Sequence, residues 1–222
     1  METASLREQA LVTIKQGILD SRYPPGSLIS ENQLAEELRI SRTPVREAIR
    51  ELAASGLVRI LPQRGIIVSE PSMQDVVEVY QLREQLECFA IRIAAGRLSP
   101  ADAELLRADH GAALKHMKAG RLQDAYDASV LMHARIITLA QNGRLVKFMN
   151  QLSDQVHRFG MLTLRHGRVE PALHEHGQII DALIRQDADA AEALMRQHLR
   201  ADRDMALRLI LPAGISAGEL TA

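Results

Sequence analysis

Apolar residues recur at helical spacing in the first 40 residues of the chain, in two separate runs. The first run predicts a helix over residues 4–20, with an apolar face made of Leu6, Ala10, Ile14 and Ile18. The second run follows Ser30, a favourable N-cap residue, and carries Leu34, Ala35 and Leu38. A turn rich in proline and glycine, at 23–26, separates the two runs. The pattern therefore predicts two helices joined through a turn.

A third predicted helix carries arginines instead of apolar residues along one side. Thr43 is expected to be its N-cap, with Pro44 at the first helical position, where the missing N–H costs nothing. Arg42, Arg46 and Arg50 repeat every four residues, so they fall close to one line along the helix. A basic helix that follows another across a tight turn is typical of a helix-turn-helix.

Two short runs after this helix favour strands rather than helices. Leu57–Leu61 and Gly65–Val68 are rich in β-branched residues, and Pro62, Gln63 and Arg64 lie between them. They predict a hairpin with a basic tip. A helix-turn-helix followed by such a hairpin is a winged helix, and we expect it to occupy residues 1–70.

From residue 72 onward the pattern is helical almost without interruption. Six helices are predicted, over residues 73–96, 99–118, 121–140, 143–165, 170–186 and 187–209. Their short connections favour an antiparallel bundle in which successive helices are neighbours. The expected fold class is therefore mainly α: a winged helix-turn-helix domain, a linker that runs into the first bundle helix over residues 71–77, and a bundle of about six helices.

Composition and charge agree with this fold once the charge is examined locally. The chain has 222 residues, 46% of them hydrophobic, and a net charge of −1, which is unusual for a nucleic-acid binder. Residues 39–64, however, contain six arginines against two glutamates. The single cysteine, Cys88, excludes an internal disulfide and fits a reducing compartment. There is no apolar run of membrane-spanning length and no signal-peptide pattern, so we expect a cytoplasmic protein with no membrane partner.

Three of the eight histidines lie on apolar faces of different predicted helices. They are His133, His176 and His198. Neutral imidazole is the commonest ligand of transition metals, so three of them from separate helices can hold zinc or nickel if they converge. Periodicity alone does not establish convergence, and by itself it favours three hydrogen-bonded core histidines.

Taken together, several segments resemble the GntR family of transcription regulators, specifically its FadR-like branch with an all-helical effector domain of the FCD type. The segments are Leu34–Leu38, Ser41–Leu52, Gly56–Val58 and Gln63–Gly65, then Leu82–Glu87, His133, Asn142, Glu175-His176 and His198. The resemblance covers nearly the whole chain. It implies a ligand-responsive regulator, more often a repressor, that binds a short pseudopalindromic operator in double-stranded DNA as a homodimer. Residues 78–210 would be its effector-binding and dimerisation domain, and residues 211–222 a flexible tail.

The resemblance assigns DNA contacts to the arginine-bearing helix and to the hairpin tip. The residues are Ser41, Arg42, Thr43, Arg46, Arg50, Arg64 and Gly65. An arginine fork can bond O6 and N7 of one guanine, whereas Arg50, further along the helix, is better placed for phosphate. Gly65 would let the backbone approach the minor groove closely. The alternative is that the arginines only solvate the helix and pair with Glu47 and Glu51.

The resemblance also implies a metal site made of an Asp, a His four residues later and two further His on separate helices. His133, His176 and His198 match the three histidines. Ser129 stands in place of the expected Asp, and Asp127 is turned about 120° from His133 on an ideal helix. Serine is a weak neutral ligand. We therefore expect either a divalent transition metal such as zinc or nickel, held by three histidines and water, or a weakened or empty site.

The resemblance places Arg83 in the effector cavity. A buried arginine needs an anion, so a small carboxylic acid is the expected effector, while Glu87, four residues on, is the alternative partner. His157 and Arg165 are expected to add polar contacts there.

Two other functions compete with this interpretation. One is a DNA-binding scaffold without metal or effector. The other is a metal-dependent hydrolase that uses the three histidines, but the sequence contains neither His-Glu-x-x-His nor Glu-x-x-His, and the winged head would have no role. We therefore do not expect an enzyme.

Overall fold

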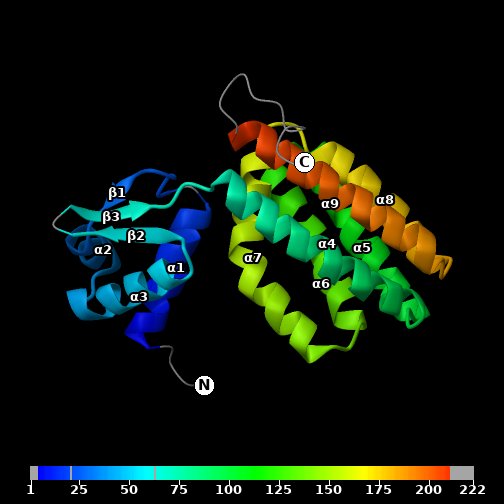
Figure 1. Cartoon of the computed structure of the whole chain (residues 1–222), viewed down its shortest axis with the longest axis horizontal. Helices are drawn as coiled ribbons and strands as arrows, with labels where there is room; N and C mark the ends of the chain where they lie inside the picture. Colours follow the sequence, from blue (N-terminus) through cyan, green and yellow to red (C-terminus); the bar gives the residue numbers. More distant parts are fainter. Residues whose placement is uncertain (1–4, 21, 63, 211–222) are drawn as a thin grey trace. The chain divides into compact units, whose positions relative to one another are not determined.

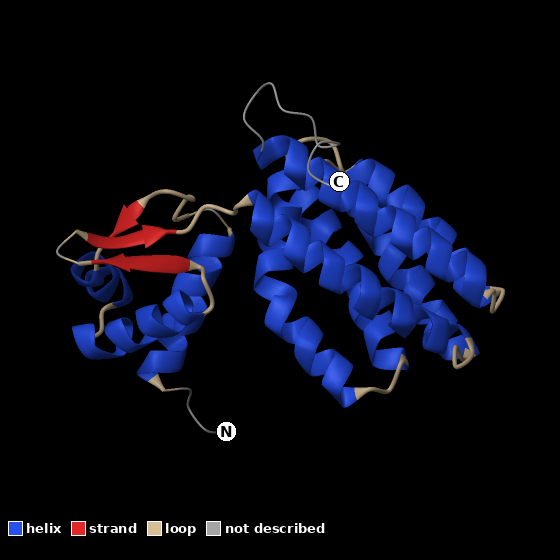
Figure 2. Ribbon diagram, viewed as in Figure 1, coloured by secondary structure: helices blue, strands red, loops and turns tan. Residues whose placement is uncertain are grey.

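The computed structural model describes residues 5–20, 22–62 and 64–210. The chain divides into two compact units, Met1–Pro71 and Ser72–Ala222, each with its own hydrophobic core. The first unit combines helices with a small sheet, whereas the described part of the second is built of helices (Figures 1 and 2). The fold class is therefore the expected one.

The first unit is a winged helix-turn-helix. Its elements are α1 (Leu6–Leu19), β1 (Leu28–Ile29), α2 (Glu31–Leu38), α3 (Arg42–Ala54), β2 (Val58–Leu61) and β3 (Gly65–Val68). Strands β2 and β3 form the expected antiparallel hairpin, with Leu61 opposite Gly65. The two-residue strand β1 pairs with the other edge of β3 and was not predicted, because two residues carry no detectable alternation.

The core of this unit joins its three helices to the hairpin. Ile14, Leu34, Ile49 and Leu57 are fully buried there. Leu6, which was predicted to lie on the apolar face of α1, is instead 52% exposed. It is the first residue of the helix, and the buried face begins one turn later at Ala10.

The turn between α2 and α3 is tight because Arg39 adopts a left-handed conformation with φ of 55°. Helix α3 then begins earlier than predicted: Ser41 occupies the N-cap position and Arg42 is the first helical residue. The assignment of Thr43 as N-cap and of Pro44 to the first helical position was therefore wrong. Pro44 is the third helical residue, and proline is tolerated there because the first-turn N–H groups have no intrahelical acceptor.

The second unit contains six helices within the described residues. They are α4 (Met73–Ala95), α5 (Pro100–Lys118), α6 (Leu122–Leu139), α7 (Gly143–Leu164), α8 (Val169–Ile184) and α9 (Ala188–Ile210). Every boundary lies within two residues of the sequence prediction. Capping explains several of them, since the Ser72 and Ser99 hydroxyls each accept from an N–H three residues on. The predicted tail, 211–222, lies outside the described residues.

Four helices, α4, α6, α8 and α9, surround the interior where the histidines lie. Helices α4 and α9 run side by side over much of their length, and α8 packs against α9 (Figure 1). Ile91, Ile136, Ile179 and Met195, one from each of the four helices, are fully buried between them. This arrangement brings residues far apart in the sequence to one point.

Candidate functional site

The three predicted histidines converge in the interior of the second unit. His133 comes from α6, His176 from α8 and His198 from α9. The Nε2 atom of His176 lies 3.2 Å from that of His133 and 3.1 Å from that of His198. His176 and His198 are almost completely buried, and His133 is 9% exposed. The convergence that periodicity could not establish is therefore present.

Carboxylates form hydrogen bonds with two of these rings at Nδ1, the nitrogen that does not face the other histidines. His133 Nδ1 donates to Glu87 Oε2 at 2.5 Å, and His198 Nδ1 donates to Glu175 Oε2 at 2.7 Å. A carboxylate on Nδ1 fixes the tautomer, so that Nε2 presents a lone pair to the centre. Glu87 also accepts from Arg83 Nε at 2.7 Å, so a buried chain of Arg83, Glu87 and His133 runs from α4 to α6.

The pKa values fit charged carboxylates beside neutral rings of His133 and His176. Burial raises the pKa of Glu87, but Arg83 and His133 outweigh burial and lower it to about 2. The pKa of Glu175 is likewise lowered to about 2, because hydrogen bonds from His198 and Arg168 outweigh its burial. Burial lowers the pKa of His133 and, assisted by the two neighbouring rings, lowers that of His176 well below its ordinary value.

Too few protons are available for the contacts between the three Nε2 atoms. With the Nδ1 protons of His133 and His198 directed to carboxylates, the Nε2 atoms of both rings are left facing His176 as acceptors. A proton on His176 Nε2 can serve only one of the two contacts, so the other brings two lone pairs together. A cation at the centre removes this repulsion. Nitrogen ligands about 2.0–2.1 Å from a tetrahedral zinc ion lie about 3.4 Å from one another, close to the separations of His176 from the other two rings. The donor set therefore fits a transition metal.

No carboxylate from α6 faces this centre. The Ser129 hydroxyl donates to the backbone oxygen of Tyr126 at 2.7 Å. Asp127 is exposed and accepts from Gln123 Nε2 at 3.0 Å, which agrees with its predicted rotation away from His133. The departure at Ser129 thus leaves α6 with one ligand.

Sequence reasoning missed two charged residues of the site, Arg168 and Asp202. Arg168, just before α8, donates to both oxygens of Glu175, at 3.0 and 2.5 Å, and through Nε to Asp202 Oδ1 at 2.7 Å. Asp202 lies one turn after His198 on α9, and its Oδ2 is 3.5 Å from His198 Nε2. The four-residue spacing of His198 and Asp202 is the signal that could have identified the second of them.

The predicted effector residues have three different outcomes. Arg83 is buried as expected, and its partner is Glu87, the alternative that the spacing had offered. His157 is half-buried on α7, with its ring edge against Tyr126. Arg165 is exposed just beyond the end of α7, so its placement in the cavity is not supported. In the connection between α7 and α8, Arg168 is the arginine that reaches the histidines.

The arginines of α3 form an exposed stripe, as predicted. Arg42, Arg46 and Arg50 are all exposed, as are Ser41, Thr43 and Arg64. Arg42 and Arg46 pair with Glu31 at the start of α2, and not with Glu47 or Glu51 as the alternative had it. Arg46 Nε lies 3.1 and 3.2 Å from the two Glu31 oxygens, Arg46 Nη2 lies 2.9 Å from Oε2, and Arg42 Nη2 lies 3.7 Å from it. The side chains of Arg42 and Arg46 remain 59% and 48% exposed.

Gly65 has a structural role that can be seen directly. Its φ of 104° is unfavourable for other residues, and an added Cβ would lie 3.1 Å from the backbone oxygen of Ile29 in β1. Glycine is therefore required where β3 meets β1. Its contact with the minor groove stays a prediction.

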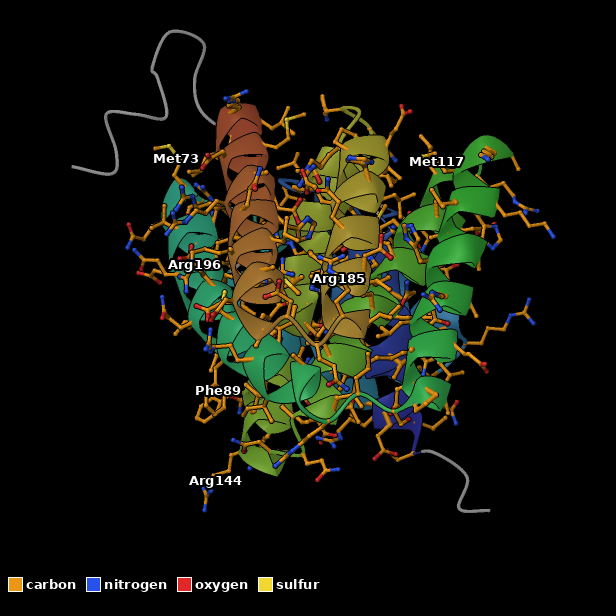
Figure 3. All side chains as sticks on the ribbon, turned by 90° about the vertical axis from the view of Figure 1, so that its right-hand side faces the viewer. Met73, Phe89, Met117, Arg144, Arg185 and Arg196 are labelled. Carbon is orange, nitrogen blue, oxygen red and sulfur yellow. The ribbon has the colours of Figure 1, made fainter. Side chains whose placement is uncertain are left out.

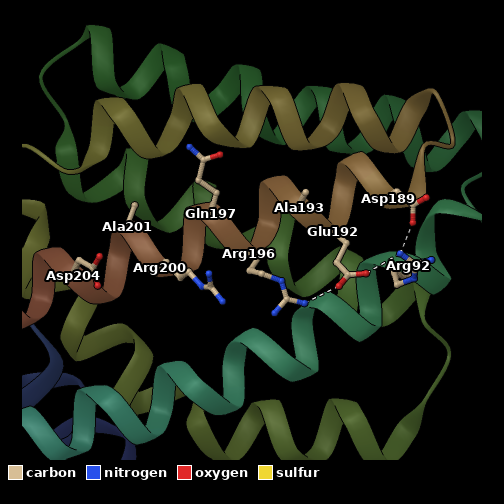
Figure 4. Close-up of a pocket in the computed structure, with 9 residues that line it drawn as sticks. All are labelled: Arg92, Asp189, Glu192, Ala193, Arg196, Gln197, Arg200, Ala201 and Asp204. Atoms are coloured by element: carbon tan, nitrogen blue, oxygen red, sulfur yellow. Dashed lines mark hydrogen bonds and ion pairs between the residues drawn. The ribbon is translucent and has the colours of Figure 1, made fainter. Parts of the chain in front are cut away.

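A separate pocket is lined by residues of α9 and by Arg92 of α4. None of the three histidines lines it. Arg92 in it bonds Asp189 and Glu192 at 2.7 and 2.8 Å (Figure 4). Arg196 and Arg200 both bond Glu84, so the arginines of this pocket are already neutralised.

Comparison with known proteins matches both units. A model of the FCD domain matches residues 78–201, and a model of bacterial regulatory proteins of the gntR family matches residues 6–68. The chain is 30% identical over 201 residues to an HTH-type transcriptional regulator in an unstable DNA locus of Streptomyces ambofaciens, covering 88% of this chain and 82% of that protein. It is 28% identical to the Escherichia coli transcriptional repressor RspR, covering 89% and 87%.

The fold is also found in solved structures. Escherichia coli McbR/YncC superposes with a TM-score of 0.78 at 19% identity, covering 93% of this chain and 99% of that one. No helix in the described part of the chain is both long and apolar enough to cross a membrane.

Proposed function

The chain belongs to the GntR family of bacterial transcription regulators and carries an FCD domain, and we propose that it reads a short pseudopalindromic operator as a homodimer and is switched by a small carboxylic acid. The observation that carries the proposal is the convergence of three Nε2 atoms in the FCD domain. Members of this family are regulators, so the hydrolase interpretation is set aside. A relative named as a repressor supports repression as the outcome.

We propose that a divalent transition metal such as zinc or nickel is held by His133, His176 and His198. The buried nitrogens, the tautomers fixed by Glu87 and Glu175 and the shortage of protons support it. When bound, the ion supplies a positive charge with positions open to water or to the carboxylate of an effector.

The charge around the histidines makes the ion a requirement for acid binding. Glu87, Glu175 and Asp202 contribute three carboxylates, against the two guanidinium groups of Arg83 and Arg168. Without an ion the site carries one excess negative charge and repels an acid. A divalent ion reverses the sign of the site, so the acid is expected to bind only to the loaded protein.

We propose a homodimer to match a two-fold symmetric operator, and the second unit has a candidate surface for it. Leu82 and Phe89, seven residues apart on α4, are 51% and 50% exposed, and Phe148 on α7, which packs against α4, is 59% exposed. Phe89 projects outward from α4 (Figure 3). Since a bacterial protein that binds chromosomal DNA works in the cytoplasm, we place its action there.

The test combines metal analysis with thermal unfolding. Purified protein should carry close to one metal ion per chain, and its melting temperature should rise with at least one member of a panel of small carboxylic acids. That rise should vanish after chelation. His176→Gln should lose the metal, whereas His174→Gln, a change at an exposed histidine of the same helix, should keep it. A wild-type chain with neither metal nor any acid-dependent shift would instead support a DNA-binding scaffold.

A further inference from the structure

We propose that Asp202 supplies the anionic metal ligand that Ser129 cannot, so that the metal site of this chain takes its carboxylate from α9 instead of α6. The inference rests on the proposed metal site and concerns which residue completes it. Asp202 and His198 are one helical turn apart on α9, so their side chains lie on the same face.

The position of the carboxylate fits this role. Asp202 Oδ2 lies 3.5 Å from His198 Nε2, the nitrogen that faces the other two histidines. Neighbouring ligands of one zinc ion, each about 2.0–2.2 Å from it, are separated by about 3.0–3.5 Å, including in sites that keep positions open for water or an effector. A hydrogen bond from Nε2 at this distance would be long, since such bonds are usually about 2.7–3.2 Å between heavy atoms. The contact therefore suits shared coordination better than a hydrogen bond.

Arg168 holds the carboxylate in the required orientation. Its Nε donates to Asp202 Oδ1 at 2.7 Å, which leaves Oδ2 directed toward His198. The same guanidinium bonds Glu175, which in turn bonds His198 Nδ1. Each nitrogen of the His198 ring thus faces a carboxylate, and one buried arginine bonds both carboxylates. Hydrogen bonds of this kind fix the orientation of ligands in metal sites.

Asp202 must move closer to two of the three histidines to share a metal ion with them. Within the described residues, the group whose ligand atoms all lie within 4.8 Å of one another contains the three histidines and not Asp202. Joining the group requires a rotation of the short Asp202 side chain that brings Oδ2 closer to the other rings while Oδ1 stays on Arg168.

Ser129 offers a test of which residue supplies the carboxylate ligand. The Ser129 hydroxyl is already directed to the Tyr126 backbone oxygen at 2.7 Å. If Asp202 is the anionic ligand, Ser129→Asp adds a carboxylate to a site that already has one. If the position is vacant, the same change completes the site.

The experiment uses full-length protein stripped with a chelator, then titrated with Zn²⁺ in competition with a chromophoric chelator. Asp202→Asn should weaken Zn²⁺ binding by at least about tenfold. Asp204→Asn, a matched change two residues along the same helix at a 45% exposed carboxylate, should stay within about twofold of wild type. Absorption of the Co²⁺-loaded protein should change in band position and intensity for Asp202→Asn only, because the band reports the ligand set.

The double variant decides between the two carboxylate positions. Ser129→Asp should restore most of the affinity in the Asp202→Asn background and add less than about threefold to wild type. If the wild type and Asp202→Asn bind Zn²⁺ equally well, the assignment of Asp202 as a ligand is overturned and the metal site itself stands. Wild type that binds no Zn²⁺ would overturn the metal site itself. If Asp202→Asn does not fold, a gain of tenfold or more from Ser129→Asp alone would still refute the proposal.

Discussion

Replacing Arg46 with alanine removes the guanidinium that the proposed function places against a guanine. In the DNA-free protein this group bonds Glu31 through Nε and Nη2 at 2.9–3.2 Å, yet its side chain is 48% exposed. Exposed ion pairs contribute about 0–1 kcal/mol. The free energy of unfolding should therefore change little, and exchanging Glu31 for DNA should cost at most about 1 kcal/mol.

The loss in DNA binding should be larger than that cost. A bidentate arginine–guanine contact contributes about 1–3 kcal/mol of discrimination, which corresponds to about 5- to 160-fold in affinity. We therefore expect Arg46→Ala to weaken binding to the operator by a factor in that range. Binding to unrelated DNA of the same length should weaken much less, because phosphate contacts dominate it.

The assay is a gel shift or fluorescence anisotropy titration at fixed salt, with the DNA upstream of the chain's own gene and a scrambled duplex. Arg7→Ala is the matched control: Arg7 is an exposed arginine of the same unit, bonded to Glu51 at 3.2 Å, but it lies on α1. It should change operator affinity by less than about threefold. Equal losses for Arg46→Ala and Arg7→Ala, or equal losses on both DNAs, would refute the assignment of α3 as the reading helix.

Three further predictions concern the phosphate contacts, the helix packing and the acid stability. Arg50→Ala should weaken binding to both DNAs alike and reduce the slope of log K against log salt by about one, and an unchanged slope would contradict a phosphate contact. Gly160→Ala should destabilise the protein by about 1–3 kcal/mol in urea unfolding, because the new Cβ would lie 2.1 Å from the Tyr126 hydroxyl; Gly111→Ala, with open space around it, should be neutral or stabilising. Because the folded-state pKa of Glu87 is lowered from 4.5 to about 2, the unfolded chain binds more protons in acid, so the melting temperature should fall from about pH 5 downward; a flat profile from pH 5 to 3 would contradict this.

The helices could be predicted because each repeats its apolar residues over many turns. The stripe of Arg42, Arg46 and Arg50 was equally clear, since spacing alone places residues on one face. The start of α3 was misjudged because Ser41 and Thr43 are both suitable N-caps, and Pro44 is acceptable anywhere in the first turn.

The candidate site was predictable only in part, because it depends on how four helices pack. Periodicity turned His133, His176 and His198 inward, but their meeting at 3.1–3.2 Å depends on the relative heights of three helices. Arg168 lies in a connection where no repeating pattern exists, and Asp202 looks like one charged residue among many on α9. Their roles became visible only through the contacts with Glu175 and His198.

The most direct test of the central claim is the operator dissociation constant of wild-type protein in three states: stripped of metal, loaded with Zn²⁺, and loaded in the presence of an acid that raises the melting temperature. Coupling between two ligand sites is typically about 1–3 kcal/mol, so the account predicts that the constant changes by about 5- to 150-fold between at least two states. By linkage, saturating operator DNA should change the affinity for the acid by the same factor. Identical operator affinity in all three states would contradict the claim that the three-histidine site controls DNA binding.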